Sequence, residues 1–142
     1  MAHRLWGWLP VPVRHVAVIP LRADGSMPAG RCVSTWRGPV VEIREAYRDD
    51  VGLLAHELRH ARQWWLTLGW SHALYRWCPW VRLRMEAAAY AVQLGLAAPV
   101  QQPRRRLQYI DFMRRWYRLD RYPVERIAAA LDAAFARLQG RG

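Results

Sequence analysis

The sequence predicts an α+β fold, in which a small N-terminal antiparallel sheet of about three strands is followed by helices. Short β-branched runs broken by proline and glycine fill the first third of the chain. The remainder carries long stretches with helical spacing of apolar residues, separated by single glycines and prolines. Strands that precede helices in this way favour α+β over alternating α/β. We expect one domain, residues 1–142.

Three segments predict the strands. The first is β-branched and bounded by prolines, the second ends at a Gly-Pro pair, and the third alternates so that Val41 and Ile43 share one face. These segments are residues 13–20, 31–36 and 40–46.

The helices are predicted by apolar spacing and by their end signals. Asp49 or Asp50 can cap the first helix, since a short carboxylate accepts from the free amides at a helix start. Pro79 and Pro123 suit the first turns of later helices. We expect helices over residues 51–68, 71–78, 79–94, 103–118 and 123–138.

Composition narrows the classes of function. The net charge is +11 and all 22 basic residues are arginine, which favours acidic partners or a nucleic-acid backbone through long-range attraction. The two cysteines, Cys32 and Cys78, are too few for a Cys-rich structural zinc site. No apolar run is long enough for a membrane span and no secretory signal is evident, so we expect a cytoplasmic protein.

One motif carries chemistry. His56-Glu57-Leu58-Arg59-His60 lies inside the first strong helix, where positions i and i+4 share a face and two imidazoles can bind one zinc ion. Glu57 can reach a water on that ion and act as general base. By chance, this pattern would occur in roughly 0.6% of sequences of this composition. The alternative is that these residues lie on a solvated helix face and match the motif by chance.

A zinc site with three protein ligands needs a third donor. Glu86 lies in the next strong helix among small residues, so that helix could approach the first and bring a carboxylate to the metal. Glu86 could instead be a surface residue paired with Arg82 or Arg84. A rival third ligand is His72, which follows a glycine turn.

The motif, followed by a helical glutamate, resembles the gluzincin metallopeptidases, and the short chain resembles their minimal forms, the minigluzincins. The resemblance covers roughly residues 40–95. It implies that His56, His60 and Glu86 bind zinc and that Glu57 is the general base. It also implies that the strand before the active-site helix, here 40–46, binds extended peptide along its edge.

The chain departs from the gluzincin pattern after the third ligand. Gluzincins have an acidic residue three or four positions later that orients a zinc-binding histidine, whereas this chain has Ala89 and Tyr90 there. The groups that orient the ligands are therefore not predicted by the resemblance. Tyr90 lies one turn beyond Glu86 and could donate to an oxyanion, or it could be a packed core residue.

Aromatic and basic residues crowd two further segments. The tryptophans between the two ligand-bearing helices are expected to pack in the core, with an apolar specificity pocket or a membrane-surface patch as the alternative. These are Trp64, Trp65, Trp70, Trp77 and Trp80. The Arg-rich segment 104–121 carries interleaved aromatics and is expected to be a solvated helix with an aromatic inner face. Single-stranded nucleic acid is the alternative partner for that segment.

The expected function is therefore that of a zinc-dependent hydrolase, a metallopeptidase that binds one Zn²⁺ and cleaves peptide or protein substrates. Two alternatives remain open at this stage. One is a basic protein associated with nucleic acid, and the other is a scaffold that keeps its metal for stability without catalysis. The sequence does not identify a substrate or an oligomeric state.

Overall fold

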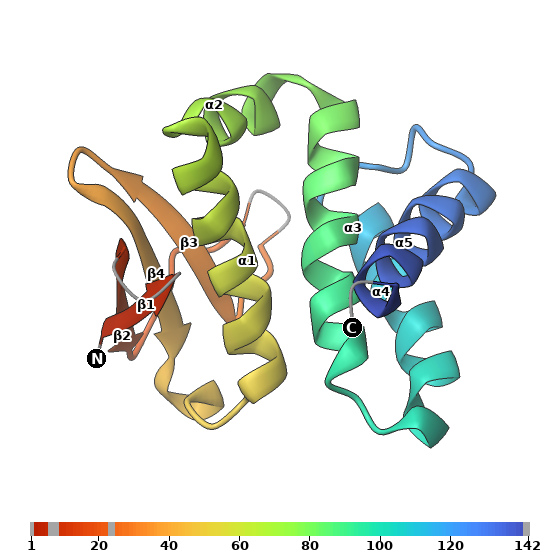
Figure 1. Cartoon of the computed structure of the whole chain (residues 1–142), viewed down its shortest axis with the longest axis horizontal. Helices are drawn as coiled ribbons and strands as arrows, with labels where there is room; N and C mark the ends of the chain where they lie inside the picture. The colour runs from red at the N-terminus through yellow and green to blue at the C-terminus, as the bar shows by residue number, and fades with distance from the viewer. Residues whose placement is uncertain (1, 6–8, 23–24, 141–142) are drawn as a thin grey trace. The chain divides into compact units, whose positions relative to one another are not determined.

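The computed structural model describes residues 2–5, 9–22 and 25–140 and confirms the α+β class. The chain divides into two compact units, Met1–Ala73 and Leu74–Gly142, which are described separately. Figure 1 shows the strands and helix α1 of the first unit and the helices of the second. No helix in the described part of the chain has both the length and the apolar character that crossing a bilayer requires.

The first unit begins with a four-stranded sheet in the order β1-β2-β4-β3. β1 pairs antiparallel with β2, and β4 pairs antiparallel with β3. The strands are β1 (Ala2–Leu5), β2 (Leu9–Val16), β3 (Gly30–Thr35) and β4 (Gly38–Arg44).

The predicted antiparallel sheet is wrong in one respect, because β2 and β4 run parallel, with Val13 opposite Val41. The sheet is therefore mixed. The β3–β4 hairpin returns β4 to the inside of the sheet, so β3 becomes the outer strand. Alternation of apolar residues reports which face is buried, and it carries no information on strand direction.

The strand expected at residues 13–20 corresponds to β2, which begins earlier, at Leu9, and β1 was not expected. The prediction used prolines as strand boundaries, since proline cannot donate to a ladder, whereas β2 contains Pro10 and Pro12. In β2 the two prolines pair only with β1, and pairing to β4 begins at Val13. Both prolines therefore lie in the part of β2 that has a neighbouring strand on one side only, where no second set of backbone hydrogen bonds is needed.

Helix α1 (Val51–Thr67) covers this sheet. Its start is capped as predicted, since Asp50 Oδ1 accepts a hydrogen bond from the Leu53 amide at 2.8 Å. The core between sheet and helix contains Val11, Val13, Val41, Ile43 and Ala61, with Cys32, Leu53, Leu54, Leu58 and Trp65 packed against it.

Helix α2 (Trp70–Trp77) follows a turn and leads into the second unit, which consists of helices packed on one another. A bidentate Arg106–Asp132 ion pair joins α4 to α5 and lowers the pKa of Asp132 through its hydrogen bonds. The elements are η1 (Glu45–Tyr47) in the first unit, and α3 (Pro79–Gly95), η2 (Pro99–Gln101), α4 (Gln102–Trp116) and α5 (Val124–Gln139) in the second.

The core of the second unit is formed by side chains from one face each of α3, α4 and α5. Two alanines of α3, Ala87 and Ala91, lie in it, so small side chains here let the helices of this unit approach closely. The core residues are Leu83, Ala87, Tyr90, Ala91, Leu94, Tyr109, Ile110, Met113, Leu119, Ile127, Leu131 and Ala134. Tyr109 and the stacked Phe112–Trp116 pair give α4 the predicted aromatic inner face, with Arg104 and Arg105 exposed.

The expectation that the tryptophans fill the core is wrong for three of them. Trp65 packs against the sheet core, but Trp70, Trp77 and Trp80 are exposed. The short helix α2 places Trp70 and Trp77 on one outward face, which composition alone does not reveal.

Gly38 offers a direct test of the first unit. Its φ is +124°, and a Cβ added there would lie 2.9 Å from Cζ2 of Trp65. We expect Gly38→Ala to lower the free energy of unfolding by about 1–3 kcal/mol, through backbone strain and the clash. Denaturant titration measures this.

Gly95→Ala is the matched control. An added Cβ there meets Phe135 at 3.8 Å, an ordinary contact, and alanine favours the helix. We expect this variant to change stability by no more than about 1 kcal/mol, in the stabilising direction. Equal destabilisation by the two variants would contradict the assigned turn geometry.

Candidate metal centre

Helix α1 brings the two motif histidines together on its buried face. His56 and His60 are one turn apart, their ring centroids lie 5.0 Å apart, and their Nε2 atoms are separated by 3.2 Å. Two nitrogens bound to one zinc at 2.0–2.1 Å in tetrahedral geometry lie about 3.3 Å apart. The observed spacing therefore fits two imidazoles that bind the same ion.

Gln63 fixes the orientation of one ring. His60 Nδ1 lies 2.9 Å from Gln63 Oε1, one turn further along α1. A carbonyl oxygen can only accept, so Nδ1 carries a proton, and in the neutral ring Nε2 then keeps its lone pair. The amide oxygen of Gln63 thus accepts a hydrogen bond from the ring and orients it, a role that an acidic residue commonly has for a metal-binding histidine.

His72 is held by other contacts. Its Nδ1 lies 2.9 Å from Ser34 Oγ, and its Nε2 lies 3.2 Å from the carbonyl oxygen of His60. Nε2 must donate to that carbonyl, which leaves Nδ1 to accept from the serine hydroxyl. Both ring nitrogens tie the start of α2 to α1 and β3, so His72 is placed as a structural residue rather than the third ligand.

Glu57, the predicted general base, is buried beside β3. A Cβ at Gly30 would lie 3.2 Å from Glu57 Cγ, which is a tight contact. Any residue other than glycine at this position would therefore force the neighbouring side chains to shift. Burial raises the pKa of Cys32, and the negative charge of Glu57 raises it further. Cys32 is therefore a neutral thiol, whereas a metal ligand would be a thiolate.

Glu86 lies on α3 in the second unit and is 1% exposed. This burial rules out the alternative of a surface glutamate. Arg82 donates instead to the carbonyl oxygens of Tyr75, Arg76 and Tyr117, and Arg84 lies over the Trp80 ring.

Tyr75 holds the Glu86 carboxylate and was not predicted. Its hydroxyl donates to Glu86 Oε1 at 2.6 Å, a short, charge-assisted hydrogen bond. Burial raises the pKa of Tyr75 well above its usual value, and the charge and hydrogen bond of Glu86 add to this rise. The hydroxyl therefore stays protonated and remains a donor. A single tyrosine in an apolar helix has no spacing signal that sequence analysis could use.

Arg82 in turn fixes Tyr75. Its guanidinium donates to the last carbonyls of α2, those of Tyr75 and Arg76, and so caps that helix end. The cap stabilises the end of α2 from which the Tyr75 side chain reaches Glu86.

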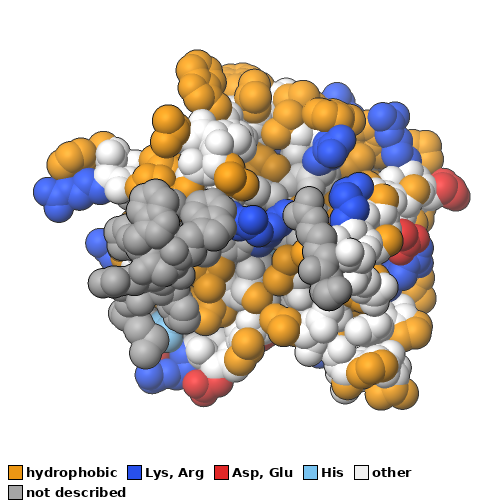
Figure 2. All heavy atoms as spheres, viewed as in Figure 1, with side chains coloured by type: hydrophobic (Ala, Val, Ile, Leu, Met, Phe, Trp, Pro, Cys, Tyr) orange, Lys and Arg blue, Asp and Glu red, His pale blue; other side chains and the backbone are white. Residues whose placement is uncertain are grey.

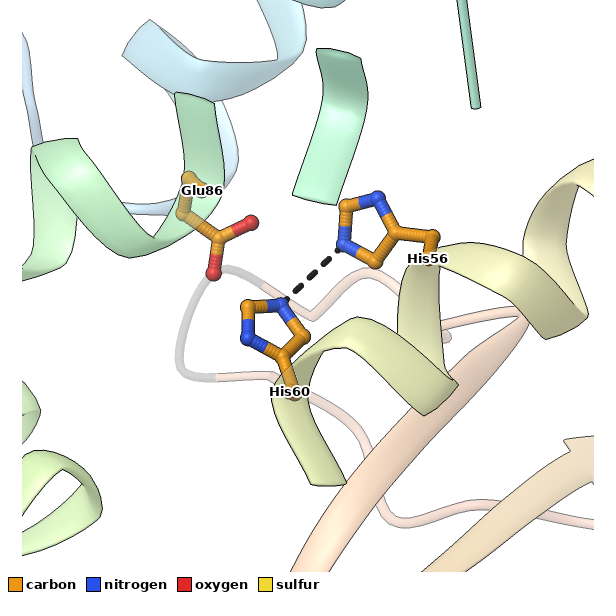
Figure 3. A group of neighbouring side chains, drawn as sticks. All are labelled: His56, His60 and Glu86. Carbon is orange, nitrogen blue, oxygen red and sulfur yellow. Dashed lines mark hydrogen bonds between the residues drawn. The ribbon is translucent and has the colours of Figure 1, made fainter. Parts of the chain in front are cut away.

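The buried group formed by His56, His60 and Glu86 could hold a metal ion (Figure 3). Each residue offers one ligand atom, and these atoms all lie within 4.8 Å of one another. Two imidazoles and one carboxylate are a donor set that zinc accepts, with a further position left for water or substrate.

Tyr90 is placed in the core of the second unit. Its ring stacks on Tyr109 with centroids 4.7 Å apart, and its hydroxyl donates to the Tyr117 hydroxyl at 3.3 Å. These contacts correspond to the packed-core alternative, and the catalytic role of Tyr90 stays a prediction.

The strand expected to bind peptide is not an edge strand. Residues 41–43 of β4 pair with β2 on one side and with β3 on the other, so their backbone groups are already used. The outer strand of the sheet, next to α1, is β3. The prediction for residues 40–46 is wrong because the hairpin places β3 outside β4.

Comparison of the chain with models of protein families, with curated proteins and with solved structures finds no match. The gluzincin resemblance therefore rests on the residues of the motif and on Glu86.

Tyr75 gives a test of how the carboxylate is held. We expect Tyr75→Phe to weaken zinc binding by about 10- to 100-fold, because the hydrogen bond that orients Glu86 is lost while the ring remains. Competition with a chromophoric chelator measures the affinity.

Tyr122→Phe is the matched control for this prediction. Tyr122 packs against the core of the second unit, and the Arg126 guanidinium lies 4.8 Å from its ring centroid. It should keep the zinc affinity of the unaltered chain. An unchanged affinity in Tyr75→Phe would show that this hydrogen bond does not support the metal centre.

Proposed function

We propose that this chain is a zinc-dependent hydrolase that cleaves peptide bonds, with the ion held by His56, His60 and Glu86. One observation carries the proposal. Among the described residues, the buried polar or charged side chains are His56, Glu57, His60 and Glu86. These are the motif residues together with the third ligand. Burial of ionisable groups is costly unless they are compensated, and a divalent cation compensates two carboxylates and two imidazoles at once.

Each residue then has a defined role. Zinc, when bound, supplies a Lewis acid that polarises a carbonyl and acidifies water. His56 and His60 bind through Nε2, and Gln63 keeps His60 in the tautomer that permits this. Glu57 accepts the proton of the attacking water and returns it to the leaving amine. Tyr75 keeps the Glu86 carboxylate oriented.

The outer strand β3 supports the choice of a peptide substrate. Its backbone pairs with β4 on one side, and an extended peptide could add to the other side by backbone hydrogen bonds. Glu57 lies against the first residue of this strand, Gly30. A peptide on β3 would therefore run past the general base.

Glu57→Gln separates metal binding from catalysis. The amide keeps the shape of the side chain but cannot take a proton. We expect the variant to retain about one zinc per chain and to lose about 10²- to 10⁴-fold in turnover. Zinc content by mass spectrometry and cleavage of an internally quenched peptide library provide the two readouts.

His15→Ala is the control, because His15 is exposed on β2 and should affect neither readout. Two results would contradict the proposal. One is wild-type cleavage that survives complete removal of metal by a chelator. The other is zinc binding with no cleavage of any library member, which would favour the metal-stabilised scaffold.

A further inference from the structure

Apolar side chains are exposed where α1 ends and α2 begins. Leu66 and Leu68 project into solvent, and Leu68 is 75% exposed. On α2, Trp70, Leu74 and Trp77 are exposed at spacing i, i+4 and i+7, which places them along one helix face. In Figure 2, hydrophobic side chains project along the edge of the view where Figure 1 labels α2.

The turn between β3 and β4 adds a further tryptophan at the same end of the first unit. Trp36 is 86% exposed. Two contacts fix the turn beside the end of α1 and the start of α2: Gly38 lies against the Trp65 ring, and Ser34 is hydrogen-bonded to His72. We call the set Trp36, Leu66, Leu68, Trp70, Leu74 and Trp77 the Trp-Leu patch.

The chain segment that carries most of the Trp-Leu patch has charged residues of one sign only. Residues 58–85 contain five arginines, five tryptophans and no Asp or Glu. Arg37 lies over the Trp36 ring at 4.4 Å, and Arg76 lies 5.9 Å from the Trp77 ring. Within the described residues neither arginine forms an ion pair with an acidic side chain. Both cations thus remain available to an anionic partner.

Leu68 shows that folding alone does not account for the Trp-Leu patch. Its φ is 49° and its ψ 41°, the left-handed conformation that ends α1. Glycine or asparagine adopts this conformation at lower cost than leucine. An exposed leucine here gains little from packing and carries backbone strain, so its apolar surface calls for another explanation.

We infer that the Trp-Leu patch docks this protein on an anionic membrane surface. Tryptophan rings favour the boundary between headgroups and acyl chains, leucines insert just below it, and arginines bind the anionic headgroups. The interaction is peripheral, since no described helix can span a bilayer. The proposal is independent of the metal centre, because none of these residues is a metal ligand or the general base.

Co-sedimentation with vesicles tests the docking. The probes are vesicles of phosphatidylcholine alone and vesicles in which about a third of the lipid is phosphatidylglycerol. We expect binding to the anionic vesicles that weakens as salt is raised, and quenching of tryptophan fluorescence by brominated acyl chains. Trp70→Ser with Trp77→Ser should weaken binding at least about tenfold. Arg76→Gln should weaken it about fivefold.

Leu68→Gly separates docking from folding. It removes apolar surface but relieves the left-handed backbone, so its melting temperature should equal or exceed that of the unaltered chain while vesicle binding falls. Leu107→Ser, at an exposed leucine on α4 outside the Trp-Leu patch, is the matched control and should bind normally. Glu57→Gln should also bind normally, which distinguishes this proposal from the proposed catalysis.

Three results would overturn the inference. The first is no binding to anionic vesicles at low salt. The second is equal binding by the double tryptophan variant and the unaltered chain. The third is a dimer in solution that the tryptophan variants abolish, without vesicle binding, because the Trp-Leu patch would then be an interface between two copies.

Discussion

The interaction on which the rest of the structure depends is the approach of two imidazoles across one turn of a buried helix. His56 and His60 bring their Nε2 atoms to 3.2 Å, and Gln63 keeps a proton off the second of them. When no metal is bound, one proton between the two Nε2 atoms can form a hydrogen bond, and a divalent cation can take the place of that proton. The metal binding and the proton chemistry that we propose for this chain both require this pair.

Much of the surrounding fold serves to hold these groups. The Asp50 cap and the sheet core fix α1, while His72 ties the start of α2 to β3 and α1. In the second unit, the core of α3, α4 and α5 fixes α3, and Arg82 and Tyr75 hold the Glu86 carboxylate from the end of α2. His60 and Glu86 are thus each oriented by a residue of their own unit, as the ligands of the proposed metal site would need to be.

The sequence predicted what local rules determine. Helix bounds followed from apolar spacing, from Asp50 and from Pro79, and the ligand residues followed from the i, i+4 motif and a glutamate among small residues. Strand direction, the outer position of β3 and the Tyr75–Glu86 hydrogen bond depend on contacts between distant segments, which no local pattern encodes. Core packing was the favoured prediction for the tryptophans of α2 because tryptophan is common in cores, and composition does not determine which face of a short helix is exposed.

The most direct test of the metal centre is diffraction from zinc-soaked crystals at energies on either side of the zinc absorption edge. We expect one anomalous peak about 2.0–2.2 Å from Nε2 of His56, from Nε2 of His60 and from a carboxylate oxygen of Glu86. A peak bound by His72 in place of Glu86, or no peak between the two imidazoles, would contradict it.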